Sequence, residues 1–172
     1  MSSSSTPRIA TSRRGFLAAG AALGLAGCGF KLRQAPDFAF SSIAMPTTSA
    51  YLAQLKRAIE VTGKLKVLPM EQWEQAEAVF DMLGETRDQW VLSTNSAGQV
   101  RDLQLFLRVR FKLRTPQGKE LIGPSEIMQS RDITYNETAA LAKETESQLL
   151  YRDMTNDIVQ QTLRRLGAVK SL

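Results

Sequence analysis

Residues 103–114, "LQLFLRVRFKLR", carry an aliphatic or aromatic side chain at every second position, and all but one of the residues between them are polar or charged. The apolar set is Leu103, Leu105, Leu107, Val109, Phe111 and Leu113, and the set between them is Gln104, Phe106, Arg108, Arg110, Lys112 and Arg114. Successive side chains of a strand point to opposite faces, so this pattern predicts a strand with one buried face. The fold must therefore cover one side of a sheet and leave the other side open.

The segments on either side of this strand predict an antiparallel meander. Asn95-Ser96-Ala97-Gly98 is typical of a hairpin connection, and Thr115-Pro116-Gln117-Gly118 is typical of a turn. Gly123-Pro124 interrupts the return strand, where we expect a bulge or a sheet edge. The expected strands are residues 77–83, 90–94, 103–114 and, on the return, 120–122 with 126–135.

Two amphipathic segments predict helices. The first helix is expected to begin at a cap offered by Thr47, Thr48 or Ser49 and to end at Gly63. The second, residues 136–167, carries apolar side chains at helical spacing, among them Leu149. Residues 38–45 and 64–68 are typical of short strands. We therefore predict an α+β fold: a two-layer sandwich, with two helices packed on one face of a mostly antiparallel four-stranded sheet.

The N-terminal residues have the composition of an export signal. Arg13 and Arg14 precede residues 15–27, which carry no charge, and small residues lie just before Cys28. The apolar stretch is shorter than the about 20 residues that a transmembrane helix needs. This pattern predicts a cleaved targeting segment.

Leu25-Ala26-Gly27-Cys28 resembles the lipobox of bacterial lipoproteins. The resemblance implies that diacylglycerol is joined to the Cys28 sulfur and that the chain is cut before this residue. Two or three acyl chains hold a protein on a bilayer, whereas one chain binds only marginally. We expect residues 1–27 to be a removed signal, 28–37 a lipidated tether and 38–172 a single domain. The alternative is an ordinary signal peptide with a chance cysteine.

The export route and the target membrane are also suggested by short motifs. Residues 12–17, "SRRGFL", resemble a twin-arginine motif, and the general secretory route remains an equal alternative. Gly29 stands where an aspartate would, by resemblance to enteric lipoproteins, favour retention in the inner membrane. We therefore expect a lipid-anchored protein of the outer membrane.

Charge and composition argue against several classes of function. The net charge is +5, but three of the 22 basic residues and none of the acidic ones lie in residues 1–27. The expected mature chain has a net charge of only +2, so the positive charge of the full sequence is no argument for nucleic-acid binding. The chain has no histidine and a single cysteine, which excludes an internal disulfide, Ser-His-Asp and Cys-His sites and histidine-ligated metals.

Other candidate chemistry is weak. Glu71, Glu74 and Glu77 repeat every three residues, and we interpret them as a solvated face beside Trp73 rather than a carboxylate site for acid–base work or calcium. No glycine-rich phosphate loop is present. We therefore expect neither an enzyme nor a cofactor.

The chain resembles the lipopolysaccharide-assembly lipoprotein family LptE. The resemblance rests on "CGFKLR" at residues 28–33, on "ALAKETESQ" from Ala140, and on the order of the predicted elements. It implies a plug seated inside the outer-membrane β-barrel protein LptD, which helps that barrel fold and binds lipopolysaccharide. The protein would be anchored in the outer membrane and would face the periplasm and the barrel lumen.

Two groups of cations are candidates for lipopolysaccharide binding. The resemblance implies a contact at Lys143, whereas the family's other basic contact falls at Ser96, a departure. Lipid A is phosphorylated, and phosphate pairing with arginine or lysine is charge-assisted. The strand cations, Arg108, Arg110, Lys112 and Arg114, are the second group. The alternatives are a solvated sheet face for the strand cations and an ordinary exposed helix lysine for Lys143.

Two competing functions fit the same anchor. One is a periplasm-facing lipoprotein scaffold that binds peptidoglycan or another envelope complex. The other is an anchored subunit of an exported redox enzyme, which would need cofactor ligands. The absence of histidine and of a second cysteine argues against the redox subunit.

Overall fold

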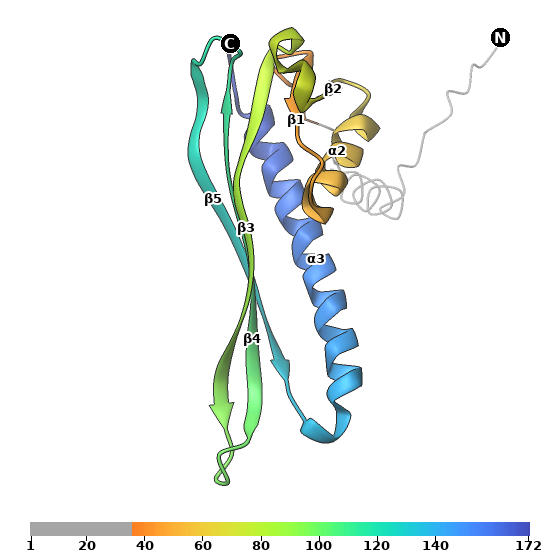
Figure 1. Cartoon of the computed structure of the whole chain (residues 1–172), viewed down its shortest axis with the longest axis vertical. Helices are drawn as coiled ribbons and strands as arrows, with labels where there is room; N and C mark the ends of the chain where they lie inside the picture. Colours follow the sequence, from red (N-terminus) through yellow and green to blue (C-terminus); the bar gives the residue numbers. More distant parts are fainter. Residues whose placement is uncertain (1–35) are drawn as a thin grey trace, which may run out of the picture. The chain divides into compact units, whose positions relative to one another are not determined.

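The computed structural model describes residues 36–172. The predicted signal, the lipidation residue Cys28 and most of the tether lie outside the described residues. The strands are β1 (Ser42–Met45), β2 (Lys66–Pro69), β3 (Ala78–Thr94), β4 (Val100–Arg114) and β5 (Glu120–Thr134). The helices are α2 (Ala50–Thr62) and α3 (Ala140–Gly167), with 3₁₀ segments η1 (Met70–Gln75) and η2 (Glu137–Ala139) (Figure 1).

The sheet has five strands in the order β2-β1-β3-β4-β5 and is mixed, so the expected mostly antiparallel four-stranded sheet missed one strand and the parallel pairing of β1. β1 pairs in parallel with both β2 and β3, and α2 forms the crossover from β1 to β2. β1 and β2 have four residues each, too few for a periodicity that would reveal their partners. The α+β class and the two main helices were predicted correctly.

β3 is one strand, where the sequence suggested two separate segments. Residues between 83 and 90 are mostly polar and half-buried or exposed, so they lack the alternation of a strand. Their backbone nevertheless pairs with β4, with Thr86 opposite Arg108 and Asp88 opposite Phe106. Pairing with a neighbouring strand extends β3 through a segment whose side chains do not predict it.

β5 lies at the edge of the sheet, as its Gly123-Pro124 pair indicated. Phe111 pairs with Ser125 and Leu113 with Ile122, so a register shift falls at this pair. Proline has no N–H to donate to a ladder, and an edge strand tolerates it best. The expected bulge and edge position are both confirmed.

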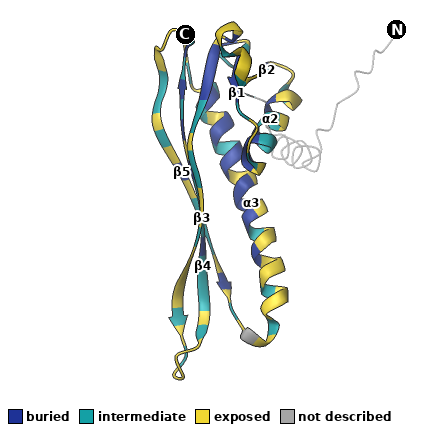
Figure 2. Ribbon diagram, viewed as in Figure 1, coloured by how far each residue is buried: buried dark blue, intermediate teal, exposed yellow. Residues whose placement is uncertain are grey.

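The core lies between the sheet and the two helices. Every second residue of β4 from Leu105 to Leu113 is apolar and fully buried, and this set shares one cluster with Tyr151, Met154 and Ile158 of α3. Figure 2 shows the buried residues of α3 on the side that faces the sheet, whereas the end of the β3–β4 hairpin is mostly exposed or half-buried. Both helices cover the same face, as predicted.

The helix ends mostly follow the sequence signals. The Ser49 hydroxyl accepts a hydrogen bond from the Leu52 N–H at 3.3 Å, and Gly63 ends α2 with a positive φ of 64°. Asn136 caps the 3₁₀ segment η2 by accepting from the Thr138 N–H, and α3 itself begins at Ala140. Leu149, expected on the apolar side of α3, is 52% exposed, so this expectation was wrong. No helix within residues 36–172 is long and apolar enough to cross a membrane.

A buried hydrogen bond joins the two helices. The Tyr51 hydroxyl of α2 lies 2.9 Å from the Thr162 hydroxyl of α3. The Thr162 hydroxyl donates its only hydrogen to the Ile158 carbonyl, so the Tyr51 hydroxyl is the donor to Thr162. Burial raises the pKa of the Tyr51 phenol far above its usual range, which keeps this donor protonated.

Replacing Tyr51 with phenylalanine should therefore lower the free energy of unfolding by about 1 kcal/mol, because one buried hydrogen bond is lost while Thr162 keeps its own acceptor. Urea denaturation of the purified protein measures the change. Tyr135 is a half-buried residue outside the core, so Tyr135→Phe is the matched control. An equal loss in both variants would show that the bond between α2 and α3 has no special role.

Candidate functional site

The cations of β4 point away from the helices. Arg108, Arg110, Lys112 and Arg114 alternate with Leu107, Val109, Phe111 and Leu113, all of which are fully buried against α3 or its neighbours. The four cations therefore lie on the outer face of the sheet, which neither α2 nor α3 covers. The structure places them where a ligand or partner could reach them.

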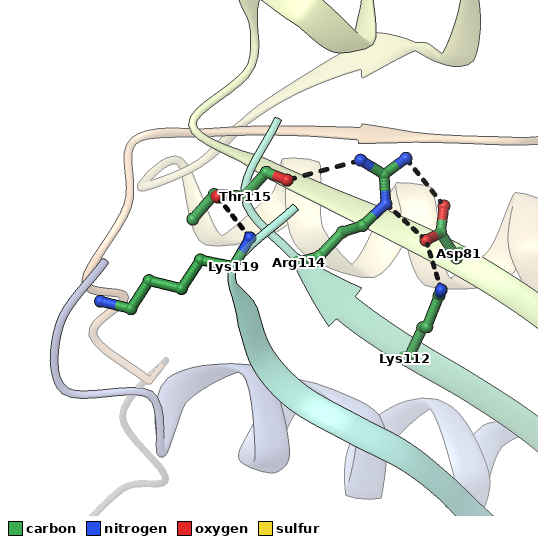
Figure 3. Close-up of polar contacts among 5 residues, drawn as sticks. All are labelled: Asp81, Lys112, Arg114, Thr115 and Lys119. Carbon is green, nitrogen blue, oxygen red and sulfur yellow. Dashed lines mark hydrogen bonds and ion pairs between the residues drawn. The ribbon is translucent and has the colours of Figure 1, made fainter. Parts of the chain in front are cut away.

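Two of these cations share one carboxylate. Asp81 of β3 lies opposite Lys112, with the Lys112 Nζ 3.6 Å and the Arg114 Nε 2.7 Å from its Oδ2 (Figure 3). The Arg114 guanidinium also donates to the Thr115 carbonyl and lies 5.4 Å from the centre of the Trp73 ring. This end of the strand is a compact ion-pair cluster whose cations already have partners.

The other two cations differ in their surroundings. The Arg108 Nε lies 3.5 Å from the Glu126 Oε1 on β5. Within residues 36–172, Arg110 has no ion pair, and its guanidinium lies over Gly84, where an added Cβ would be 3.4 Å from the Arg110 Nη2. Arg110 is therefore the strand cation most available to a ligand.

An apolar patch lies beside these cations on the same face. Trp90 and Phe106 are in contact, with ring centres 4.8 Å apart, and Trp90 is 61% exposed. Met128 of β5 is 47% exposed and its sulfur lies 3.7 Å from the Arg108 Nη2. The sequence pattern assigned Phe106 to the outer face but did not predict that strand pairing would bring Trp90 and Met128 close to it.

Lys143 belongs to the other layer of the fold. It lies near the start of α3, and its Nζ pairs with the Glu146 Oε2 at 2.9 Å on the same helix. Since α3 packs on the inner face and the strand cations lie on the outer face, the structure does not bring the two candidate groups together. Ser96 lies in the turn between β3 and β4, where the sequence placed it.

The glutamates before β3 do not form a metal site. The Glu77 carboxylate accepts a hydrogen bond from the Ser41 N–H at 2.6 Å, which ties it to the start of β1. Glu71 and Glu74 are exposed in η1. In the part of the chain that the structure describes, no group of three or more acidic, cysteine or histidine side chains is placed to hold a metal ion.

Sequence reasoning missed a further cationic site. Arg57 of α2, Arg87 of β3 and Arg152 of α3 line a cavity of about 650 Å³. These residues are far apart in the sequence and belong to no shared motif, so no sequence signal could have found them together. Only the packing of α2 against α3 creates this cavity.

Comparison with known proteins identifies the family. The family model described as lipopolysaccharide-assembly, LptE, matches residues 38–166, which is well over half of the chain. The chain belongs to the LptE family. The solution NMR structure of lipoprotein B from Nitrosomonas europaea is similar with 32% identity and a TM-score of 0.69, covering 81% of this chain and 91% of that one. A search of curated proteins gives no match.

More distant structures share the fold. Rare lipoprotein B from Shewanella oneidensis has 21% identity and a TM-score of 0.61, over 72% of this chain and 92% of that one. A minor lipoprotein from Acinetobacter baumannii has 17% identity and a TM-score of 0.58, over 76% and 92% of the two chains. The resemblance to the LptE family seen in the sequence is thus confirmed.

Membership in the LptE family defines the broad role of the chain. This is a family of lipopolysaccharide-assembly lipoproteins of the cell envelope and is not an enzyme family, in agreement with the sequence-based expectation. The matched range covers almost all of the described residues, including every strand and nearly all of α3. The cationic and apolar surfaces described above therefore belong to the LptE-type domain itself.

Proposed function

We propose that this chain is an outer-membrane lipoprotein that plugs an LptD-like β-barrel, assists the folding of that barrel and binds lipopolysaccharide during its transport to the cell surface. The observation that carries this proposal is the LptE-family match over residues 38–166. The protein would face the periplasm and the barrel lumen.

The open face of the sheet supports a role as a binding partner. It combines the exposed Trp90 and the half-buried Phe106, which are in contact, with cations that are only partly neutralised. Exposed apolar side chains grouped on one surface are typical of protein contact sites. We propose that this face, rather than the helical layer, contacts the barrel.

The lipid anchor is part of the proposal. Residues 1–27 would be removed, residues 28–37 would form the lipidated tether, and residues 38–172 would form the periplasmic domain. The lipobox-like sequence that ends at Cys28 supports this organisation.

Replacing Cys28 with alanine should abolish membrane anchoring, because this sulfur is the only proposed attachment point for the lipid. The variant is expected to be uncleaved or to be released with the periplasmic fraction, as measured by fractionation and mass spectrometry. A wild-type mature chain that carries an unmodified cysteine would contradict the proposed anchor.

Copurification tests the plug function directly. The full-length chain, tagged at its C-terminus and isolated from detergent-solubilised outer membranes, should recover a large β-barrel protein in equal amount. Recovery of peptidoglycan fragments or another envelope complex without a barrel would instead support the competing scaffold function. Trp90→Ser with Phe106→Ser should reduce barrel recovery, because the two rings supply much of the exposed apolar surface of the open face.

Charge reversal tests glycolipid binding. Arg110→Glu, Arg108→Glu with Arg110→Glu, and Lys143→Asp should each weaken lipopolysaccharide binding at least tenfold, because a charge-assisted contact becomes a repulsion. Binding of labelled lipopolysaccharide to the purified protein measures the effect. Glu126 pairs with Arg108 and also lies opposite Arg110 in the sheet, so thermal unfolding must verify that each strand variant is folded.

The matched control is Arg164→Glu, an exposed arginine of α3 outside both candidate groups. It changes the net charge as much as Arg110→Glu does. If the control weakens binding equally, long-range attraction rather than a site explains the affinity. A loss of barrel recovery in the strand variants would show that the strand cations, like Trp90 and Phe106, contact the barrel, and Lys143 would then be the glycolipid contact.

A further inference from the structure

A cavity of about 650 Å³ lies between α2, α3 and β3, on the helical side of the sheet. This volume is within the range of about 300 to 1,000 Å³ that is typical of small-ligand sites. The short side chain of Ala53 on α2 leaves the space open. Gln54 of α2 and Asn156 of α3 also line the cavity and are joined by a side-chain hydrogen bond that ties the two helices together.

The charge of this cavity has one sign. Among the described residues that line it, three are arginines and none is an aspartate or glutamate. Arg87 lies 5.3 Å from the centre of the Tyr151 ring and 3.6 Å from the Glu85 carboxylate, so its charge is partly balanced. Within residues 36–172, Arg57 and Arg152 have no ion pair.

Arg57 and Arg152 are exposed, so water weakens their mutual repulsion, but a bound anion would balance the charge of both and form hydrogen bonds with them. The two unpaired guanidinium groups together carry two positive charges. A phosphate monoester carries about −1.5 to −2 near neutral pH and accepts paired hydrogen bonds from arginine. A carboxylate carries only one negative charge and would leave one arginine unbalanced.

We propose that the cavity lined by Arg57, Arg87 and Arg152 binds a phosphate-bearing ligand. Arg57 and Arg152 supply the charge-assisted hydrogen bonds, and Arg87 is held in place by Glu85 and by the Tyr151 ring. The phosphate belongs either to a glycolipid head group or to a small soluble compound.

This site goes beyond the proposed function and is distinct from its candidate contacts. Arg152 follows Lys143 by nine residues on α3, which corresponds to about 13 Å along the helix axis. The strand cations lie on the other face of the sheet. The cavity therefore adds a phosphate site on the helical layer that does not depend on either group.

The test compares three probes on the full chain purified in detergent: inorganic pyrophosphate, lipopolysaccharide and dephosphorylated lipopolysaccharide. Arg57→Gln with Arg152→Gln should raise the Kd for pyrophosphate at least tenfold. Ala53→Phe should do the same, because it fills the cavity and leaves every charge in place. Thermal unfolding verifies that each variant is folded.

The control is Arg101→Gln with Arg164→Gln, which removes two exposed arginines outside the cavity and changes the net charge equally. It should leave the Kd for pyrophosphate within twofold of the wild type. If the control weakens binding as much as the cavity variants do, or if folded cavity variants bind pyrophosphate normally, the proposal is overturned.

The lipid probes identify the source of the phosphate. If the cavity variants also weaken binding of lipopolysaccharide but not of its dephosphorylated form, the site takes a glycolipid head group. If they weaken only pyrophosphate binding, the ligand is a soluble phosphate compound. If barrel recovery falls in the cavity variants while pyrophosphate binding is unchanged, the cavity holds an acidic protein segment and the phosphate proposal is wrong. Barrel recovery by the wild type tests the plug function separately.

Discussion

The packing of α3 against the apolar face of β4 is the interaction on which the rest of the structure depends. Leu105, Leu107 and Val109 are fully buried in one cluster with Met154 and Ile158. A slip of one residue in the strand would turn its cations into this core, where unpaired charge is costly. The same packing therefore fixes the register of the sheet and forces the basic residues of β4 outward.

The two faces of the sheet consequently have different chemistry. The inner layer is apolar at its centre and carries the arginine-lined cavity where α2 meets α3. Neither α2 nor α3 covers the outer face, which combines an ion-pair cluster around Asp81 with the exposed Trp90 and the half-buried Phe106. A two-layer domain of this kind can contact a protein partner through its open sheet and still present a separate polar site on its helices.

Neighbouring acids reduce the cationic character that the sequence suggests for β4. Asp81 and Glu126 come from the strands on either side of β4 and pair with Lys112, Arg114 and Arg108. Among the described residues Arg110 has no ion pair, because Gly84 opposite it on β3 has no side chain and the carboxylate of Glu126 opposite it on β5 pairs with Arg108 instead. The number of cations along one strand therefore does not show how many of them are free to bind a ligand, because acidic residues on the neighbouring strands can pair with them.

The sequence by itself determined the features that local periodicity encodes. The alternation in residues 103–114 defined the buried and open faces of β4, a run of capping residues and Gly63 indicated the ends of α2, and short motifs indicated the LptE family. Only the tertiary structure decided the parallel pairing of β1 and the continuity of β3. It also separated Lys143 from the strand cations and placed Arg57 and Arg152 around one cavity. These features depend on contacts between segments distant in the chain, which no local pattern records.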